Sequence, residues 1–359
     1  MRKLRVAIIG QGRSGRGIHG VYFLSEKNTN VEVVYVVDAL AVRREKAQNE
    51  FGCPTLANYQ ELFGKNAEID LVVNASFSQD HYAITKDLLC HGFNVLVEKP
   101  FGRTSYECYD LIATARKHGV IVTGFHQTLI TPSFLEIQDI INSGKLGEVF
   151  QISLKYSGFA RRWDWQTLQA CCAGSVFNSG PHPIGQGLAF LGWDKNVRVA
   201  YSDLKTVLTS GDAEDYGKII LTAPNKFTVD IEICSADAFA NDFVFKVFGS
   251  KGTLIASNSD YTIKRVETEK LPPRPVVRES LMDENGNPMF CSEALPFIEE
   301  KGAFSGSAFD QAVQDFYAML YETIINGKEL RITPEMAAEV VRIIEICHAQ
   351  NPLPVKYEA

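Results

Sequence analysis

Short apolar runs alternate with helix-period segments along the first 125 residues. The runs are rich in β-branched residues and apolar throughout, which is typical of strands buried on both faces; they span residues 6–9, 31–37, 71–73, 94–97 and 120–123. Apolar positions recur at helical spacing in residues 42–51, 81–90 and 105–118. This alternation predicts a doubly wound parallel sheet of the Rossmann type, with helices on both faces, over residues 1–125.

The pattern changes to alternating apolar and polar positions after a further helix at 133–142. Such alternation predicts antiparallel strands, here at residues 149–154, 218–221, 227–234, 243–248 and 261–266. One helix is expected at 183–191, and two amphipathic helices at 308–326 and 334–348, the last with Thr333 as N-cap. Residues 267–304 show no clear period and are expected to form a long loop.

The whole chain is therefore predicted to be α/β plus α+β, in two domains. Residues 126–359 would form an α+β domain with an open, mostly antiparallel sheet, whose C-terminal helices pack back on the first domain. A length of 359 residues supports two domains, because single cores stop growing at about 250–300 residues.

Composition and charge argue against several classes of function. The net charge is −7 and no run of Lys or Arg exceeds two residues, which argues against a nucleic-acid partner. No stretch approaches the roughly 20 apolar residues of a membrane span, so no membrane partner is expected. The eight cysteines show no Cys-x-x-Cys pair or zinc spacing, so we expect no metal and reduced thiols. A cytoplasmic enzyme is the simplest prediction.

The turn Gly10-Gln11-Gly12-Arg13-Ser14-Gly15 is the firmest candidate site. It follows a predicted strand and opens a predicted helix, which is the context that gives a Gly-x-Gly-x-x-Gly pattern its meaning. The first glycine permits the tight turn, the second lets the backbone approach a pyrophosphate, and the third allows helix and strand to pack closely. The sequence therefore predicts a dinucleotide cofactor.

Asp38 ends the second predicted strand, 23 positions beyond Gly15. A carboxylate there can accept hydrogen bonds from the adenosine ribose and repels a 2′-phosphate. NAD is thus preferred over NADP, although Arg43 and Arg44 lie close enough in sequence to reach a 2′-phosphate.

Glu98-Lys99-Pro100 follows another strand at the carboxyl edge of the sheet, where such sheets bind ligands. Together with the glycine turn, residues 94–100 resemble the Gfo/Idh/MocA family of oxidoreductases. The resemblance continues in the second domain and the C-terminal helices, at residues 173–182, 248–254, 316–328 and 333–337.

This resemblance implies a substrate site between the two domains. It implies that Lys99 contacts substrate and nicotinamide ribose and that His182 acts as acid or base, which suits removal of a proton from a hydroxyl. The family usually has an aspartate four residues before that histidine, and this chain has Asn178; a second usual aspartate is replaced by Gly185. Asn178 could still orient a substrate hydroxyl.

Five further residues are placed near the cofactor. Ser76-Phe77-Ser78 stands where the family has Thr-Pro-Asn, with Ala75 directly before it. His81 follows; in the family this histidine lies near the cofactor, and the alternative is that it only starts its helix. His126 replaces an asparagine after the last predicted strand of the first domain, and is either a cofactor-side group, a substrate-side group or a plain strand-end histidine. Glu98 joins this set because it adjoins Lys99.

Residues 161–165, Arg-Arg-Trp-Asp-Trp, lead into the histidine motif. Arg162 supplies donors, and Trp163 and Trp165 supply flat apolar faces, a combination suited to a sugar or cyclitol; the alternative is a packed loop corner.

The predicted function is therefore an NAD(P)-dependent oxidoreductase that transfers a hydride at a secondary hydroxyl of a sugar, sugar derivative or cyclitol. Two alternatives stay open: a redox-assisted glycosidase that regenerates its NAD, and a cofactor-sensing regulatory protein with reduced turnover. The resemblance also implies a homodimer or homotetramer formed through the open sheet face.

Overall fold

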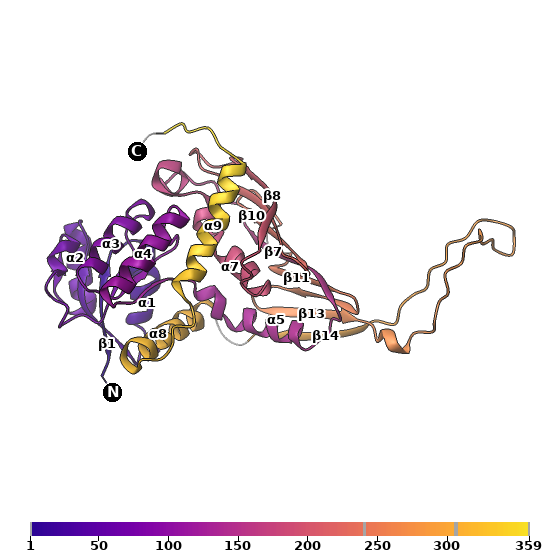
Figure 1. Cartoon of the computed structure of the whole chain (residues 1–359), viewed down its shortest axis with the longest axis horizontal. Coiled ribbons are helices and arrows are strands. Elements are labelled where there is room, and N and C mark those ends of the chain that lie inside the picture. The colour runs from indigo at the N-terminus through magenta and orange to yellow at the C-terminus, as the bar shows by residue number, and fades with distance from the viewer. Residues whose placement is uncertain (1, 240–241, 305–307, 358–359) are drawn as a thin grey trace.

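The computed structural model describes residues 2–239, 242–304 and 308–357, and it contains two sheets with helices between them (Figure 1). The first sheet is parallel, in the order β3-β2-β1-β4-β5-β6. Its strands are β1 (Leu4–Ile9), β2 (Val31–Val37), β3 (Thr55–Leu56), β4 (Leu71–Asn74), β5 (Val95–Val97) and β6 (Val122–Gly124). The prediction of a Rossmann-type sheet is confirmed. The two-residue β3 was not predicted, since it is too short to show a pattern.

Strand β1 shows why this sheet needs helices on both faces. Leu4, Val6 and Ile8 belong to one buried cluster, whereas Ala7 and Ile9 belong to another. Successive side chains of a strand point to opposite faces, so each face must be covered. Helices α2 (Ala41–Phe51), α3 (His81–Cys90) and α4 (Ser105–His118) match the predicted helices within one residue.

The second sheet has eight strands in the order β14-β13-β12-β11-β7-β10-β9-β8. All its neighbouring strands pair antiparallel except β7 and β10, which pair in parallel, so the expected open, mostly antiparallel sheet is confirmed. The strands are β7 (Val149–Ser157), β8 (Arg198–Lys205), β9 (Tyr216–Thr222), β10 (Thr228–Cys234), β11 (Phe245–Gly249), β12 (Gly252–Ala256), β13 (Asp260–Arg265) and β14 (Ile298–Ala303).

The prediction of one loop over 267–304 is wrong at both ends. A short 3-10 helix, η7 (Thr268–Lys270), opens the segment and β14 closes it. Strand β14 is an edge strand with the sequence Ile-Glu-Glu-Lys-Gly-Ala, and its inward positions are only half-buried. β8 is the other edge strand, and only Leu204 in it is buried. Edge strands bury few side chains, and the usual apolar alternation is therefore weak in both.

Among the described residues, helices cover only one face of the second sheet. Helices α5 (Pro132–Asn142), α7 (Pro181–Phe190) and α9 (Pro334–Gln350) lie on the side that faces the first domain, and the opposite face is open in Figure 1. Helix α9 contacts both α4 of the first domain and β8 of the second sheet, and α8 (Ala308–Asn326) lies beside the first domain. Thr333 occupies the N-cap position of α9, but its side chain makes no capping hydrogen bond.

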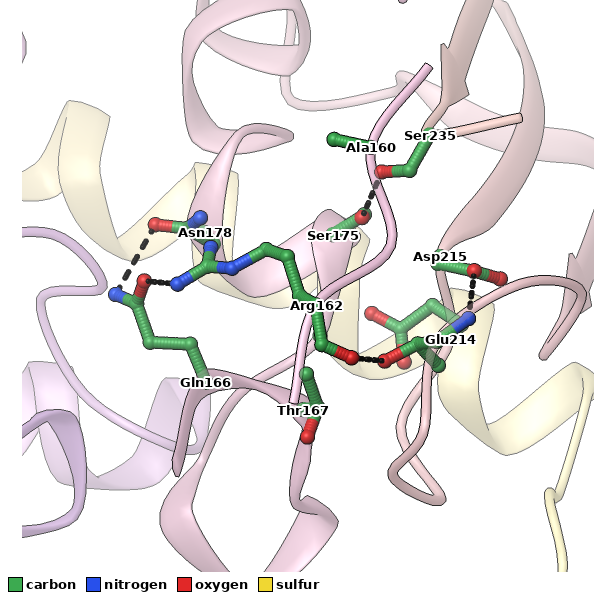
Figure 2. A pocket seen from close by; sticks show the side chains of 11 residues that line it. Ala160, Arg162, Gln166, Thr167, Ser175, Asn178, Glu214, Asp215 and Ser235 are labelled. Carbon is green, nitrogen blue, oxygen red and sulfur yellow. Dashed lines mark hydrogen bonds between the residues drawn. The ribbon is translucent and has the colours of Figure 1, made fainter. Parts of the chain in front are cut away.

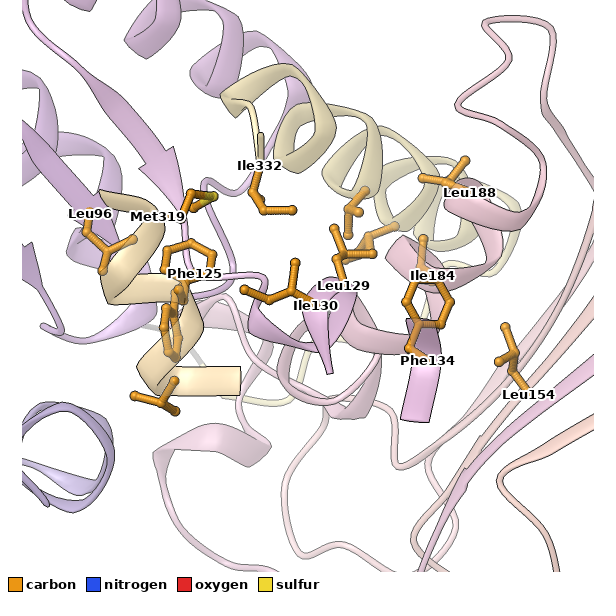
Figure 3. Close-up of a cluster of buried hydrophobic side chains, with 14 of the residues drawn as sticks. Leu96, Phe125, Leu129, Ile130, Phe134, Leu154, Ile184, Leu188, Met319 and Ile332 are labelled. Atoms are coloured by element: carbon orange, nitrogen blue, oxygen red, sulfur yellow. The ribbon is translucent and has the colours of Figure 1, made fainter. Parts of the chain in front are cut away.

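One buried apolar cluster runs continuously from the first sheet to the second. Figure 3 shows Leu96 and Phe125 at one end, Leu129 and Ile130 in the middle, and Leu154 of β7 at the other. A shared core fixes how the two sheets face each other. The side chains that reach the space between them are therefore held at defined positions. None of the helices in the described ranges is long and apolar enough to cross a bilayer.

Candidate functional site

The three glycines of the turn after β1 are needed for different structural reasons. Gly10 has a φ of +89°, and a Cβ there would lie 2.4 Å from the carbonyl oxygen of Ala75. A Cβ on Gly15 would lie 1.8 Å from the carbonyl oxygen of Gly10, so the fold itself requires both residues. A Cβ on Gly12 would meet no protein atom within 4 Å. Gly12 thus borders open space where a pyrophosphate fits against the backbone.

Asp38 holds this turn from the end of β2. Its Oδ2 accepts the backbone N–H of Gln11 at 2.8 Å, and its Oδ1 accepts the N–H of Leu40 at 2.9 Å. The guanidinium of Arg43 is 3.5 Å from Oδ2, whereas Arg44 donates to the carbonyl oxygens of Asp38 and Ala39. Arg44 therefore braces the loop, and Arg43 is the cation beside the predicted ribose position.

The chain after Gly15 forms a π-helix, η1 (Gly15–Gly20), that continues into α1 (Val21–Phe23). This wider turn carries His19, which is fully buried. His19 Nε2 lies 3.1 Å from Glu98 Oε1, and His19 Nδ1 lies 2.6 Å from the hydroxyl of Tyr317 on α8. Local irregularities of this kind are frequent at functional sites. The motif after β5 is thus tied through His19 to a helix near the C-terminus.

Glu98 is a buried carboxylate held by several donors. Burial by itself raises its pKa, but the hydrogen bond from His19 and the nearby charges of His19 and Lys99 outweigh it and lower the pKa to about 2. Its Oε2 also accepts the backbone N–H of Lys99 at 3.0 Å. Glu98 therefore orients the backbone of Lys99, and a cis peptide bond joins Lys99 to Pro100.

Lys99 reaches from the first domain to the second. Its Nζ donates to Asn178 Oδ1 at 2.8 Å, and Asn178 lies at the end of the short helix α6 (Ser175–Asn178). Burial, followed by the charges of Arg13 and Arg162, lowers the pKa of Lys99, while Glu98 opposes the change. The predicted catalytic lysine and the asparagine that replaces an aspartate are therefore direct partners.

A second amide fixes the orientation of Asn178. Gln166 Nε2 lies 3.4 Å from Asn178 Oδ1, and Gln166 Oε1 accepts a hydrogen bond from Arg162 (Figure 2). The oxygen of Asn178 thus faces two donors, and its amide nitrogen is left to donate to a ligand. Arg162 is also paired with Asp164 at 2.7 Å, so its charge is partly neutralised.

Figure 2 shows the pocket that borders these residues. Glu214 and Asp215 lie on its far side from Gln166, but both carboxylates serve the local backbone. Glu214 accepts the N–H of Val176 at 2.9 Å and lies 3.1 Å from His348 Nε2. Asp215 accepts three backbone N–H groups of residues 207–209. The side of the pocket near Asn178 is therefore the one available to a ligand.

His182 begins the next helix, α7, close to the same lysine. Its Nδ1 lies 3.2 Å from Thr128 Oγ1, and its ring stacks at 6.4 Å from that of Tyr156. Thr128 is itself held, because its carbonyl oxygen accepts from Gln186 Nε2 at 3.2 Å. Burial, and then the charge of Lys99, lower the pKa of His182 to about 3. The ring is neutral at ordinary pH and able to accept a proton.

His126 lies beside Gly185, the other position where the family resemblance implies an aspartate. A Cβ on Gly185 would lie 3.9 Å from His126 Nδ1, and this buried nitrogen has no hydrogen-bond partner among the described residues. Burial lowers the pKa of His126 to about 4, so its ring is neutral. Buried polar atoms are rarely left unpaired, which makes Nδ1 of His126 a candidate contact for a ligand or an ordered water.

The loop after β4 contains the remaining cofactor-side predictions. Ser76 Oγ donates to Asn74 Oδ1 at 2.7 Å, and Ala75 packs against the glycine turn. His81 is buried, and its ring nitrogens lie 2.7 Å from the carbonyl oxygen of Pro100 and 3.2 Å from that of Ser76. His81 thus joins the loop after β4 to the loop after β5.

The two predicted tryptophans have different surroundings. Trp165 packs edge-on against Phe77 at 4.9 Å, which joins the second-domain loop to the loop after β4. Trp163 is 81% exposed. The role of each in substrate binding stays a prediction.

The sequence reasoning missed several residues of this site, namely His19, Thr128, Tyr156, Gln166 and Tyr317. Only Tyr317 lies in a segment used in that reasoning, residues 316–328, where it was given no role in the site. Nine positions separate Gly10 from His19, so a histidine on the helix after the glycine turn was a second available signal.

Fold and site together define a nicotinamide-dependent oxidoreductase. Residues 4–126 match the family model described as oxidoreductase family, NAD-binding Rossmann fold, and residues 134–255 match the GFO/IDH/MocA C-terminal domain. The chain belongs to the GFO/IDH/MocA family. Solved structures with the same fold include GenD2 from gentamicin A biosynthesis in complex with NAD and KijD10, a 3-ketoreductase from Actinomadura kijaniata in complex with NADP and TDP-benzene.

The chain is similar to these proteins over nearly its whole length. GenD2 is 18% identical with a TM-score of 0.76, covering 99% of this chain and 97% of GenD2. KijD10 is 16% identical with a TM-score of 0.77, covering 97% and 98%. In sequence, the scyllo-inositol 2-dehydrogenase (NADP(+)) IolW of Bacillus subtilis is 22% identical over 95% of this chain and 92% of its own, and the uncharacterized oxidoreductase YhhX of Escherichia coli is 25% identical over 90% of each.

Proposed function

We propose that this oxidoreductase transfers a hydride between its nicotinamide cofactor and a secondary hydroxyl of a sugar, sugar derivative or cyclitol. The observation that carries the proposal is the hydrogen bond between Lys99 of the first domain and Asn178 of the second, with His182 close enough for the charge of Lys99 to lower its pKa. A cation, a free amide donor and a neutral imidazole converge there, as oxidation of an alcohol requires. The names of IolW, an inositol dehydrogenase, and KijD10, a ketoreductase, agree with such substrates.

The hydrogen bonds indicate a role for each residue of the site. A bound nicotinamide would supply the hydride acceptor for the carbon that bears the hydroxyl. The hydroxyl proton passes to Nε2 of His182, because Nδ1 is occupied by Thr128. Lys99 donates to the substrate oxygen and stabilises the negative charge that develops on it, and the amide nitrogen of Asn178 holds a neighbouring hydroxyl. Arg162, Trp163 and Trp165 would contact the rest of the substrate.

We assign the cofactor to the glycine turn Gly10–Gly15, with Asp38 at its ribose and Ala75, Ser76, His81, Glu98, Lys99 and His126 along the nicotinamide half. The position of Asp38 supports a preference for NAD over NADP, since a carboxylate repels a 2′-phosphate. We also propose a boundary between the domains near residue 125 and assembly as a homodimer or homotetramer. All eight cysteines are unpaired, which supports work in a reducing compartment such as the cytoplasm.

Absorbance at 340 nm tests the reaction. The purified protein, NAD or NADP and a panel of sugars and polyols should give net reduced cofactor with at least one substrate. Release of a free sugar without net reduced cofactor would instead identify a redox-assisted glycosidase. Tight cofactor binding with neither reaction would identify a cofactor sensor.

The variant Lys99→Ala tests the assignment of the site. Turnover should fall by orders of magnitude while the Kd for NAD stays within a few-fold, because the lysine acts on the substrate oxygen. Lys117→Ala, on the exposed side of α4, is the matched control and should leave both quantities unchanged. Unchanged turnover in Lys99→Ala would refute the assignment.

A further inference from the structure

A long arm leaves the second sheet between η7 and β14. It comprises residues 271–297 and extends away from both domains, beyond the ends of β13 and β14 (Figure 1). Nearly all of its residues are exposed. Loops of this length without a core of their own are uncommon in compact domains and are usually functional or disordered.

The outgoing and returning halves of the arm are paired with each other. Arg274 Nη2 forms an ion pair with Glu293 Oε2 at 2.5 Å, part of the way along the arm. Near the tip, Met282 and Pro288 form an antiparallel bridge, and Met289 N–H donates to Leu281 O at 3.0 Å. Asp283 closes the turn by accepting from the backbone N–H of Asn285 and Asn287. The arm is therefore a ribbon with a defined tip.

Large apolar side chains along this ribbon are exposed to solvent. Phe290 is 93% exposed and Val276 is 90% exposed; Met282, Met289 and Phe297 are at least half exposed. A disordered linker typically has few aromatic residues and little apolar content. Exposed apolar side chains grouped on one element instead mark a surface that binds a partner.

A receiving surface lies on the same sheet. On the face that no helix covers, Phe248 of β11 pairs with Phe150 of β7 at a ring distance of 6.1 Å, and the Lys246 ammonium lies 4.9 Å from the Phe248 ring. Phe150 is 57% exposed and Ile255 of β12 is 41% exposed. The arm carries four acidic and two basic residues, so its net negative charge complements Lys246.

We propose that the arm of one copy crosses the open sheet face of a second copy of this chain, over β11 and β12. The arm starts after β13, the strand next to β12 in the same sheet, and returns to β14 at the edge of that sheet. A two-fold axis would therefore let each copy place its arm on the other copy. Such an isologous contact buries the apolar residues of both arms at once. The proposal builds on the homo-oligomer proposed above and does not depend on the redox reaction.

Light scattering coupled to size exclusion tests the arm. The double variant Val276→Ser/Phe290→Ser removes the two most exposed apolar side chains of the arm, and their exposure keeps them out of the fold of the single chain. Tyr106→Ser, which removes a 76% exposed aromatic side chain from α4, is the matched control. We expect the double variant to dissociate at a protein concentration at least ten-fold higher than the wild type and the control.

The possible outcomes distinguish the proposed arm contact from the proposal of a homo-oligomer. If the double variant forms an oligomer that dissociates at the same concentration as the wild type, the proposed arm contact is refuted, but the proposed homo-oligomer is not. A wild-type protein that is monomeric up to about 100 µM would refute both.

A photo-crosslinking amino acid at position 290 gives an independent test. Unlabelled protein that carries it is mixed with ¹⁵N-labelled wild type, and the crosslinked peptides are identified by mass spectrometry. Crosslinks between labelled and unlabelled chains at peptides that contain residues 246–256 would support the proposal. Crosslinks only within one chain, only to other surfaces, or none at all would overturn it.

Discussion

The ammonium of Lys99 donates a hydrogen bond to the amide oxygen of Asn178 at 2.8 Å. The two residues are 79 positions apart and come from different domains, so this contact closes the site between them. Its acceptor is a neutral amide, whereas the family resemblance implies a carboxylate at this position. Lys99 is a half-buried cation beside a neutral acceptor. Burial and the charges of Arg13 and Arg162 lower its pKa, while the charge of Glu98 opposes the change.

Asn178→Asp is expected to reverse part of that shift. A carboxylate within hydrogen-bonding distance favours the ammonium form and raises the pKa of a lysine by about one to three units. Activity that needs protonated Lys99 is lost as pH rises through this pKa, so the alkaline limb of kcat/KM should move to higher pH. The matched control Asn225→Asp adds the same charge in the exposed turn between β9 and β10. A limb that stays in place in Asn178→Asp would contradict the role of Lys99.

The pH profile on the acid side should report the lowered pKa of His182. A free histidine would protonate near its usual value of about 6.5, but this ring has a pKa of about 3 because it is buried near Lys99. As a base it stays deprotonated when pH falls from 8 to 5. We therefore expect kcat/KM for alcohol oxidation to show no inflection near 6.5, and His182→Ala to lower kcat about 10²- to 10⁴-fold. A histidine-like inflection that disappears in His182→Ala would contradict the neutral buried ring.

Gly12→Ala and Gly15→Ala form a matched pair that separates cofactor binding from folding. A Cβ at position 12 would meet no protein atom within 4 Å, whereas a Cβ at position 15 would lie 1.8 Å from Gly10 O. Gly12→Ala should therefore keep the melting temperature and weaken NAD binding at least ten-fold, measured by calorimetry. Gly15→Ala should lower the melting temperature by several degrees. Equal NAD affinity in Gly12→Ala and wild type would argue against a pyrophosphate at this turn.

Tyr317→Phe tests the buried contact with His19. The change removes the hydroxyl 2.6 Å from His19 Nδ1 and leaves a fully buried nitrogen without its partner. An unsatisfied buried polar group costs about 1–3 kcal/mol of the free energy of unfolding, measurable by urea denaturation. Tyr22→Phe is the control and should cost less, because Tyr22 stacks on Tyr317 but has a longer bond to Asn30, at 3.3 Å. An equal loss of unfolding free energy in the two variants would mean that the contact between Tyr317 and His19 does not stabilise the fold.

Asp38→Ala and Arg43→Ala should move the cofactor preference in opposite directions. Loss of the carboxylate removes the repulsion of a 2′-phosphate, so the NAD over NADP ratio of kcat/KM should narrow. Loss of the Arg43 guanidinium, 3.5 Å from that carboxylate, should widen the ratio by weakening NADP. Because Asp38 also accepts the N–H of Gln11, the melting temperature of Asp38→Ala must be compared with that of wild type. An unchanged ratio in both variants would refute the ribose position.

The local pattern of apolar residues was sufficient to predict the helices and strands in which apolar positions recur at regular spacing. Strands such as β2 and helices such as α3, α4 and α8 lie where the apolar spacing predicts them, because burial demands that spacing in the sequence itself. Edge strands β8 and β14 were not predictable in this way, since they bury few side chains and rely on hydrogen bonds to the neighbouring strand. The arm lies in a segment whose pattern predicts only a loop, because its pairing depends on contacts between its two halves.

The sequence by itself determined the parallel sheet, the glycine turn and the lysine motif, since each depends on residues adjacent in the chain. Only the tertiary structure decided what surrounds them. Tyr317 meets His19 across 298 positions, and Lys99 meets Asn178 across 79. Such pairs arise when a shared core fixes two domains against each other, and no local spacing encodes them. The electrostatic surroundings that set the pKa values of Lys99 and His182 follow from that packing.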